Sequence, residues 1–189
     1  MEEKVLVVSG HPDLNQSFAN KIILEELQTR LPNAIIVYLD KLYRNYQINV
    51  EMEQQRLEDA DIIVLQFPLF WYGIPALMKK WMEDVFIHGF SHGSTGNKLS
   101  GKKLIISFTS GAPEHLYQHG ESQNYTVDEF LYPLKQFSNL CGMKWQDYVY
   151  SGGLSYQSRH DEEKLKQMQA KAISHAEKLA DQILLISQK

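Results

Sequence analysis

Residues 66–75, Gln-Phe-Pro-Leu-Phe-Trp-Tyr-Gly-Ile-Pro, form the segment of this chain whose residue types are best suited to chemistry. The segment follows an apolar run at 62–65, which is typical of a buried parallel strand. Two prolines and a glycine end that strand, so the aromatic side chains at 70–72 lie in a loop at its carboxyl end. Ligands of open α/β sheets bind at such strand ends. The segment therefore predicts a slot for a flat, largely apolar ring.

A second candidate segment is the loop at 9–18, Ser-Gly-His-Pro-Asp-Leu-Asn-Gln-Ser-Phe, which joins a predicted strand to a predicted helix. The first amides and the dipole of a helix favour an anion at this position. The loop has no lysine or arginine, so a phosphate would be held by backbone N–H and hydroxyl groups. Ser17 is placed to cap the helix and to contact a phosphate oxygen, and His11 can donate. An ordinary capped loop is the alternative interpretation.

A third candidate segment is 109–113, Thr-Ser-Gly-Ala-Pro, after the fourth predicted strand. Small residues let a ligand approach the backbone closely, and free N–H groups there could stabilise negative charge developing on a bound ring. Tyr117 adds a phenolic donor, and His119 is either a proton donor or a plain loop histidine. A tight turn that needs small residues is the alternative for the whole segment.

The histidines do not predict a metal site. His88 and His92 are four residues apart, and so are His115 and His119, but both pairs lie in loops that contain glycine or proline. Neither pair has an obvious third ligand, so no metal is expected. Cys141 is expected to be a small buried apolar residue.

The elements that must position these segments alternate along the chain. Strands are predicted at 5–9, 34–39, 61–67, 104–108 and 145–150. Helices are predicted at 17–31, 51–59, 74–87, 126–141 with a kink at Pro133, and 161–185. Such alternation predicts a parallel sheet with right-handed crossovers. We expect a single domain over 1–189, an α/β flavodoxin-like three-layer sandwich with five parallel strands in the order 2-1-3-4-5 and helices on both faces.

Two features of this arrangement remain open at the level of sequence. The loops at 88–102 and 110–125 are long enough to be functional, and both are expected to border the cleft. The apolar arc of the helix at 74–87 spans roughly 180°, whereas a one-sided surface helix needs about 100°. Either a symmetric partner subunit or the 88–102 loop is expected to cover the excess.

Composition excludes several classes of function. The 189 residues carry a net charge of −4, which gives no basic surface for nucleic acid and no polybasic membrane patch. A single cysteine suits a reducing compartment. The chain has neither a membrane-length apolar stretch nor a signal-peptide pattern, so a cytoplasmic protein is expected.

Taken together, the motifs resemble those of the flavodoxin-fold NAD(P)H:quinone reductases, the DT-diaphorase-like family. The chain looks closest to the bacterial branch that includes the ancillary oxidoreductases of potassium-efflux systems. The resemblance covers essentially the whole chain and rests on matching segments at 11–12, 17–18, 66–76, 80–81, 84–86, 109–112, 117 and 140–142.

The resemblance implies a flavin at the strand ends, in a homodimer whose two sites lie at the subunit interface. It implies that the phosphate end of the flavin is bound by His11, Ser17 and Phe18. It implies that the isoalloxazine is flanked by Pro68, Leu69, Phe70, Trp71 and Tyr72. It implies that the pyrimidine edge is contacted by Thr109, Ser110, Gly111 and Ala112, with Tyr117 nearby. The family often has two glycines where this chain has Gly111-Ala112.

FMN is the expected cofactor, because the long C-terminal extension of the mammalian members is absent. FAD is the alternative, with Arg159 available for an adenine or ribose. The implied activity is hydride transfer from NAD(P)H through the flavin to a quinone or similar acceptor by a ping-pong mechanism. Tyr117, together with His119, would orient the acceptor or supply a proton.

Two other functions are weighed against this enzyme. One is a flavin-loaded regulatory subunit of a membrane potassium-efflux protein, which rests on the resemblance alone. The other is a one-electron carrier like flavodoxin. The mild charge and the long aromatic loops argue against a carrier.

Overall fold

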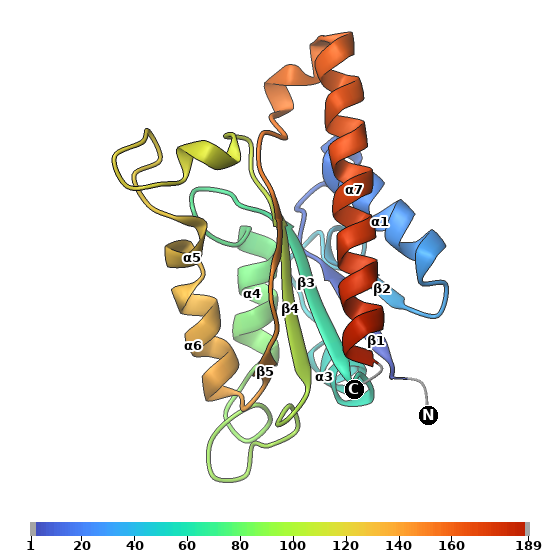
Figure 1. Cartoon of the computed structure of the whole chain (residues 1–189). Coiled ribbons are helices and arrows are strands. Elements are labelled where there is room, and N and C mark those ends of the chain that lie inside the picture. The colour runs from blue at the N-terminus through green and yellow to red at the C-terminus, as the bar shows by residue number, and fades with distance from the viewer. Residues whose placement is uncertain (1–2, 188–189) are drawn as a thin grey trace.

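A parallel sheet with helices on both faces forms the centre of the computed structural model, which describes residues 3–187 (Figure 1). Its strands are β1 (Val5–Ser9), β2 (Ile35–Tyr38), β3 (Ile62–Pro68), β4 (Lys103–Thr109), β5 (Lys144–Trp145) and β6 (Val149–Ser151). Their order is β2-β1-β3-β4-β5, with β6 also paired to β4. Every pairing is parallel. The flavodoxin-like order predicted from the sequence is confirmed.

The central strands are buried on both sides, as their apolar sequences require. All seven residues of β3 are buried, and Leu65 pairs with Val8 of β1 and with Ile106 of β4. This register brings Ser9, Gln66 and Ser107 into line across three neighbouring strands. Polar side chains therefore cross an otherwise apolar sheet near its carboxyl edge.

Two helical layers cover the sheet (Figure 1). Helices α1 (Ala19–Arg30) and α7 (Glu162–Ser187) lie on one face, where Leu27 and Ile183 belong to the same apolar core. Helices α3 (Val50–Asp59), α4 (Ala76–Val85) and α6 (Tyr132–Leu140) lie on the other face. None of the helices within residues 3–187 is long and apolar enough to cross a membrane.

The wide apolar arc of α4 is covered within the chain. Trp81 is fully buried and donates its indole N–H to Glu53 on α3 at 2.9 Å. Phe86 packs edge-on against Phe137 of α6, with ring centroids 4.8 Å apart. Leu99 of the 88–102 loop is also buried in this core. The loop thus provides part of the predicted cover, and α3 and α6 provide the rest.

The predicted helix at 126–141 is two helices, α5 (Val127–Phe130) and α6. Pro133 lies in the first turn of α6, where its missing N–H leaves no hydrogen bond unmade, so it begins a helix rather than kinking one. A capping box starts α5, where the backbone N–H of Thr126 donates to the Glu129 carboxylate at 2.8 Å.

Three other sequence-based expectations differ from the structure. The predicted strand at 145–150 is two short strands, β5 and β6, and residues 146–148 between them belong to neither. The predicted second strand ends at Tyr38, because the next residues form a short helix, α2 (Leu39–Leu42). The 88–102 loop joins the end of α4 to the start of β4, so it lies at the amino edge of the sheet and cannot border a cleft at the carboxyl edge. Short 3-10 helices occur at η1 (Leu14–Gln16), η2 (Glu114–Leu116) and η3 (Tyr156–His160).

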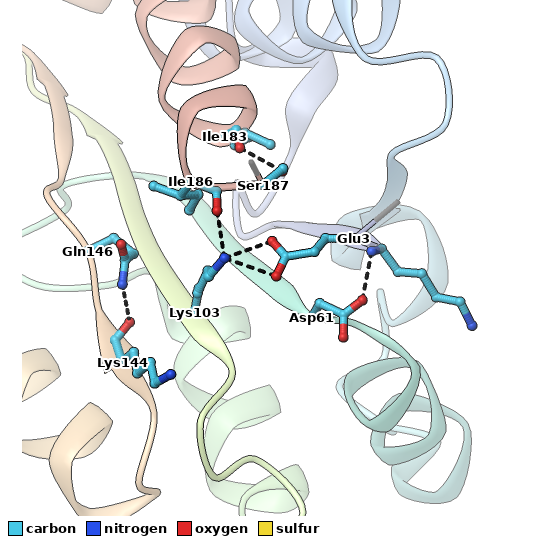
Figure 2. A network of polar contacts seen from close by, with 9 residues as sticks. Glu3, Asp61, Lys103, Lys144, Gln146, Ile183, Ile186 and Ser187 are labelled. Atoms are coloured by element: carbon cyan, nitrogen blue, oxygen red, sulfur yellow. Dashed lines mark hydrogen bonds and ion pairs between the residues drawn. The ribbon is translucent and has the colours of Figure 1, made fainter. Parts of the chain in front are cut away.

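Polar contacts at the amino edge of the sheet hold the two ends of the described chain together (Figure 2). The Lys103 ammonium, on the first residue of β4, donates to both carboxylate oxygens of Glu3, at 2.9 and 2.8 Å. It also donates to the carbonyl of Ile186, near the end of α7, at 2.6 Å. One side chain thus joins the segment before β1, the start of β4 and the last turn of α7.

Candidate functional site

A cleft of about 540 Å³ lies at the carboxyl ends of β3 and β4, against the start of α1. It collects residues from five separate segments of the chain. Its lining is His11, Pro12, Asp13, Gln16, Ser17, Phe18, Ala19, Asn20, Pro68, Leu69, Phe70, Thr109, Ser110, Gly111, Leu154, Tyr156 and Met168. The three segments singled out from the sequence therefore meet at one place.

A smaller hollow of about 220 Å³ shares Leu69 with the cleft. Its lining is Leu69, Trp71, Tyr72, Ala112, Tyr117 and Gln123. Every residue predicted to bind a cofactor lines one of these two cavities. His119 lines neither of them.

The start of α1 provides donors without charge. Ser17 Oγ accepts the backbone N–H of Asn20 at 3.1 Å, so the Ser17 hydroxyl proton stays available to a ligand. Within residues 3–187, no group accepts a hydrogen bond from the backbone N–H of Phe18 or Ala19. Among the side chains that the structure describes, no lysine or arginine lines this end of the cleft. Free helix amides and a hydroxyl group are a suitable donor set for a phosphate dianion.

His11 is a neutral donor at the same end. His11 is 9% exposed, and burial lowers the pKa of its ring although Asp40 and Asp13 act in the opposite direction. Nδ1 accepts the backbone N–H of Asp13 at 3.1 Å, so the ring proton is on Nε2. The ring lies edge-on to Phe70, with centroids 5.8 Å apart. Phe70 therefore provides an aromatic wall opposite the helix amides at this end of the cleft.

Residues 70–73 form a tight hairpin turn that sets the aromatic side chains. Phe70 and Gly73 exchange backbone hydrogen bonds, each of 3.1 Å. The two residues between them have left-handed backbones, with φ of 50° at Trp71 and 65° at Tyr72. Trp71 is 95% exposed, while Tyr72 stacks on Phe130 with centroids 5.2 Å apart. Residues other than glycine, asparagine and aspartate rarely adopt this backbone conformation, so the turn stores strain.

The turn after β4 presents backbone donors on the opposite side. Ser110 Oγ bonds the Tyr150 hydroxyl at 2.7 Å and donates to the Ala112 carbonyl at 2.9 Å, which fixes the turn. Burial raises the pKa of Tyr150, so its phenol stays protonated. The N–H groups of Gly111 and Ala112 have no acceptor among the described residues. They are available to a negatively charged edge of a ligand.

Tyr117 and His119 have different surroundings. Tyr117 is buried, with its ring edge-on to Phe130 at 6.1 Å, and it lines the smaller hollow. The His119 side chain is 65% exposed and lies 3.1 Å from a Glu129 carboxylate oxygen. Its ring contacts Tyr125 at 6.0 Å. The structure thus groups Tyr117 with the cavity walls and keeps His119 outside them.

Several cleft residues were missed from the sequence. Asn20 on α1 donates to Thr109 Oγ1 at 3.1 Å and accepts from the buried Gln66 at 2.9 Å. A polar residue inside an apolar strand or on a buried helix face was the available signal. Leu154 and Met168 lie far along the chain, and only the fold brings them to the cleft. The side chain of Arg159, named above for an adenine or ribose, lies outside the described part of the structure.

A metal centre has no support in the geometry. Among the described residues, no three or more His, Cys, Asp or Glu side chains are grouped so that they could hold a metal ion. His88 and His92 lie edge-on, with centroids 5.8 Å apart, and His92 Nδ1 bonds Ser91 Oγ at 3.0 Å.

The family is settled by comparison with known proteins. The model of the family described as having a flavodoxin-like fold matches residues 3–176. The chain belongs to the flavodoxin-like family. The resemblance to NAD(P)H:quinone reductases drawn from the motifs is confirmed at the level of family.

Similar proteins of this flavodoxin-like family carry several names. General stress protein 14 of Bacillus subtilis (strain 168) is 39% identical over 158 residues, which is 84% of this chain and 90% of that protein. The uncharacterized NAD(P)H oxidoreductase YrkL of the same organism is 38% identical with the same coverage of both. The glutathione-regulated potassium-efflux system ancillary protein KefG of Enterobacter sp. (strain 638) is 37% identical over 142 residues, 75% of this chain and 77% of that protein.

Two solved structures share the fold closely. One is general stress protein 14 of Treponema denticola in complex with FMN, with a TM-score of 0.77, 25% identity, and coverage of 91% of this chain and 99% of that one. Another is described as a thermophilic tryptophan halogenase from Streptomycin violaceusniger, with a TM-score of 0.80, 32% identity, and coverage of 90% and 97%. Because one fold hosts different activities, the function has to be argued from the cleft.

Proposed function

We propose that this chain is a flavin-dependent NAD(P)H oxidoreductase that passes a hydride from NAD(P)H to a quinone or a similar acceptor. One observation carries the proposal. Uncharged hydrogen-bond donors lie at one end of the cleft, and aromatic and small residues line the other end. A phosphate with a flat ring system matches this arrangement. The FMN complex of the Treponema denticola relative and the NAD(P)H oxidoreductase name of YrkL support the same reading.

FMN fits the donor set at the start of α1. The N–H groups of Phe18 and Ala19, the Ser17 hydroxyl and the neutral His11 ring would hold its phosphate. Pro68, Leu69 and Phe70 would flank the ring, and the N–H groups of Gly111 and Ala112 would contact its polar edge. FAD remains the alternative ligand. The bound flavin would supply the hydride-transfer chemistry.

The residues of the smaller hollow would serve the two substrates. Trp71 and Tyr72 offer aromatic faces that align a nicotinamide or a quinone ring and exclude water. Tyr117 would hold the acceptor with its phenolic O–H. One hollow for both substrates predicts ping-pong kinetics. The exposed position of His119 beside Glu129 gives its proposed role in proton transfer no support.

A homodimer is proposed as the working state. Trp71, Tyr72 and Leu140 leave large apolar area exposed, at 95%, 50% and 59%. A further, largely apolar cavity of about 450 Å³ lies between α4 and α6, and Tyr72 is part of its lining. Light scattering on purified protein tests the dimer, and a monomer at micromolar concentration would refute it. A cytoplasmic location goes with the proposal.

A regulatory role is a second candidate, favoured by the similarity to KefG. The flavin-loaded protein would then act on a membrane potassium-efflux protein. Measurement of efflux from reconstituted vesicles, with and without the purified chain, tests this role. Unchanged efflux would remove it.

The decisive experiment for the enzyme is spectroscopic and kinetic. Purified protein should show the visible bands of an oxidised flavin, and mass analysis of the released chromophore should give FMN. Addition of NADH or NADPH should bleach the bands, and a quinone should restore them. Initial rates should give parallel lines in double-reciprocal plots. A colourless protein that binds neither FMN nor FAD at micromolar concentration would refute the proposal.

A further inference from the structure

Buried polar side chains connect α7 to the wall of the cleft. His175 on α7 is 1% exposed and lies between two serines. Its Nδ1 is 2.9 Å from Ser151 Oγ, and its Nε2 is 2.7 Å from Ser107 Oγ. The imidazole therefore joins β6 to β4 through the apolar core.

The contacts continue from Ser107 to the cleft. Ser107 Oγ donates to Gln66 Oε1 on the neighbouring strand. Gln66 Nε2 donates to Asn20 Oδ1 at 2.9 Å, and Asn20 Nδ2 donates to Thr109 Oγ1 at 3.1 Å. Asn20 and Thr109 both line the cleft. We call the six residues from Ser151 to Thr109 the buried polar chain.

Each hydrogen bond in the buried polar chain has a defined direction. Ser107 has one hydroxyl proton, and an amide oxygen only accepts, so that proton goes to Gln66 Oε1. Ser107 Oγ must then accept from His175 Nε2–H. Burial lowers the pKa of His175 to about 3, so the ring is neutral and carries a single N–H. Its Nδ1 accordingly accepts from the Ser151 hydroxyl.

At the far end, the Thr109 hydroxyl keeps its proton. Its oxygen accepts from Asn20, and no acceptor for its O–H occurs among residues 3–187. If the side-chain amides of Gln66 and Asn20 were both rotated by half a turn, every hydrogen bond of the buried polar chain would reverse its direction. The unpaired hydroxyl proton would then be that of Ser151. Both hydroxyls are buried, Thr109 at 3% exposed and Ser151 at 5%. Ser151 lines neither cavity and has no other acceptor among the described residues, so the reversed chain would leave its donor beyond the reach of a ligand, whereas Thr109 lines the cleft. The observed direction places the unpaired donor where a ligand can use it.

We propose that His175 is a positioning residue that fixes the direction of the buried polar chain, so that Thr109 presents its hydroxyl to the cleft as a hydrogen-bond donor. The inference rests on the proposed flavin site. The ligand group that Thr109 recognises is an acceptor, namely a ring nitrogen or carbonyl oxygen of the flavin. His175 itself lines neither cavity.

Titration of the apoprotein with FMN, followed by flavin fluorescence, measures this role. His175→Leu removes both ring nitrogens and should raise the Kd for FMN three- to tenfold, the value of about one hydrogen bond. His175→Gln keeps a donor and an acceptor and should stay within about twofold of wild type. Leu179→Ala is the matched control, since Leu179 is fully buried on the same helix and belongs to the apolar core. It should lower Tm and leave the Kd unchanged.

A double-mutant cycle separates positioning from general loosening. Thr109→Val removes the hydroxyl and should weaken FMN binding by a similar factor. Once the hydroxyl is gone, His175→Leu should add almost nothing, because the two changes remove the same hydrogen bond. Independent effects that multiply in the double variant would overturn the proposal. So would a His175→Leu variant that binds FMN as tightly as wild type.

A measurement without flavin tests the direction itself. Nitrogen chemical shifts of the His175 ring should show the neutral tautomer with the proton on Nε2 from pH 8 down to pH 5. A proton on Nδ1, or a ring that becomes charged in this range, would overturn the inference even if FMN binds. Wild-type protein that binds no flavin would refute the proposed function instead, and the tautomer would still report on the chain.

Discussion

The hairpin turn at the cleft predicts that a single substitution can raise stability while it lowers activity. Trp71 has a left-handed backbone with φ of 50°, and its side chain is 95% exposed. A left-handed backbone costs most residues about 1–2 kcal/mol, and asparagine pays much less of this. Because the indole is nearly all in water, its removal loses little apolar burial. Trp71→Asn should therefore gain about 1 kcal/mol, which raises Tm by about 2–4 °C for a chain of this size.

The matched control for this prediction is Trp71→Ala. Alanine also removes the indole, but its Cβ keeps the strain of the left-handed backbone. Its free energy of unfolding should stay within about 0.5 kcal/mol of wild type. Both variants should lose quinone reduction to a similar extent, because both lack the aromatic wall of the smaller hollow.

Chemical denaturation followed by circular dichroism, with the same m-value for all three proteins, gives the stabilities. The prediction requires that Trp71→Asn has a larger free energy of unfolding than both Trp71→Ala and wild type. If Trp71→Asn were no more stable than Trp71→Ala, the positive φ would not be a cost, and the argument that function maintains a strained turn would be refuted.

Three further predictions concern other parts of the molecule. Ser17→Ala should weaken FMN binding about tenfold and leave riboflavin binding unchanged in fluorescence titrations, because riboflavin lacks the phosphate that this hydroxyl would contact; equal losses for both ligands would contradict it. Glu53→Ala should cost about 3 kcal/mol in urea denaturation, since it leaves the buried donors of Tyr43 and Trp81 without their carboxylate, whereas Tyr43→Phe should cost less. Stability should also fall with acid, because His175 stays neutral in the fold with a pKa of about 3 but takes up a proton near pH 6.5 when unfolded. This residue should contribute about 2.5 kcal/mol of loss between pH 6 and pH 4, and His175→Gln should show a correspondingly shallower decline.

The sheet could be predicted because most of its strands are uninterrupted apolar runs in the sequence. The order of the strands and the boundaries of β1 follow from these runs and from the alternation with helices. Errors occurred where local signals compete. Pro133 predicts a kink within one long helix, but a proline also suits the first turn of a new helix, which is where it lies. The length of the 88–102 loop predicts a position beside the cleft, but the loop leads into the start of β4 and therefore lies at the amino edge of the sheet.

The grouping of the three candidate segments at one cleft was predictable for a different reason. Loops at the carboxyl ends of parallel strands converge, so three separate motifs had to meet. The buried polar chain was not predictable, because its residues come from α1, three strands and α7 and are paired only by the fold. His119 shows that nearness in sequence is not enough. It is only two positions from Tyr117, but its ring does not line the same cavity.

The Lys103 contacts have a practical consequence for handling the protein. The residues that Lys103 ties together, Glu3 and Ile186, adjoin opposite ends of the described chain. Glu3 and Ile186 both lie beside Lys103, the first residue of β4. The cleft lies at the other end of this strand, where Thr109 is the last residue. An affinity tag, a surface anchor or a fluorescent reporter joined at either terminus would thus attach to the far side of the molecule, and an electrode or bead carrying the protein that way would leave the mouth of the cleft facing the solution.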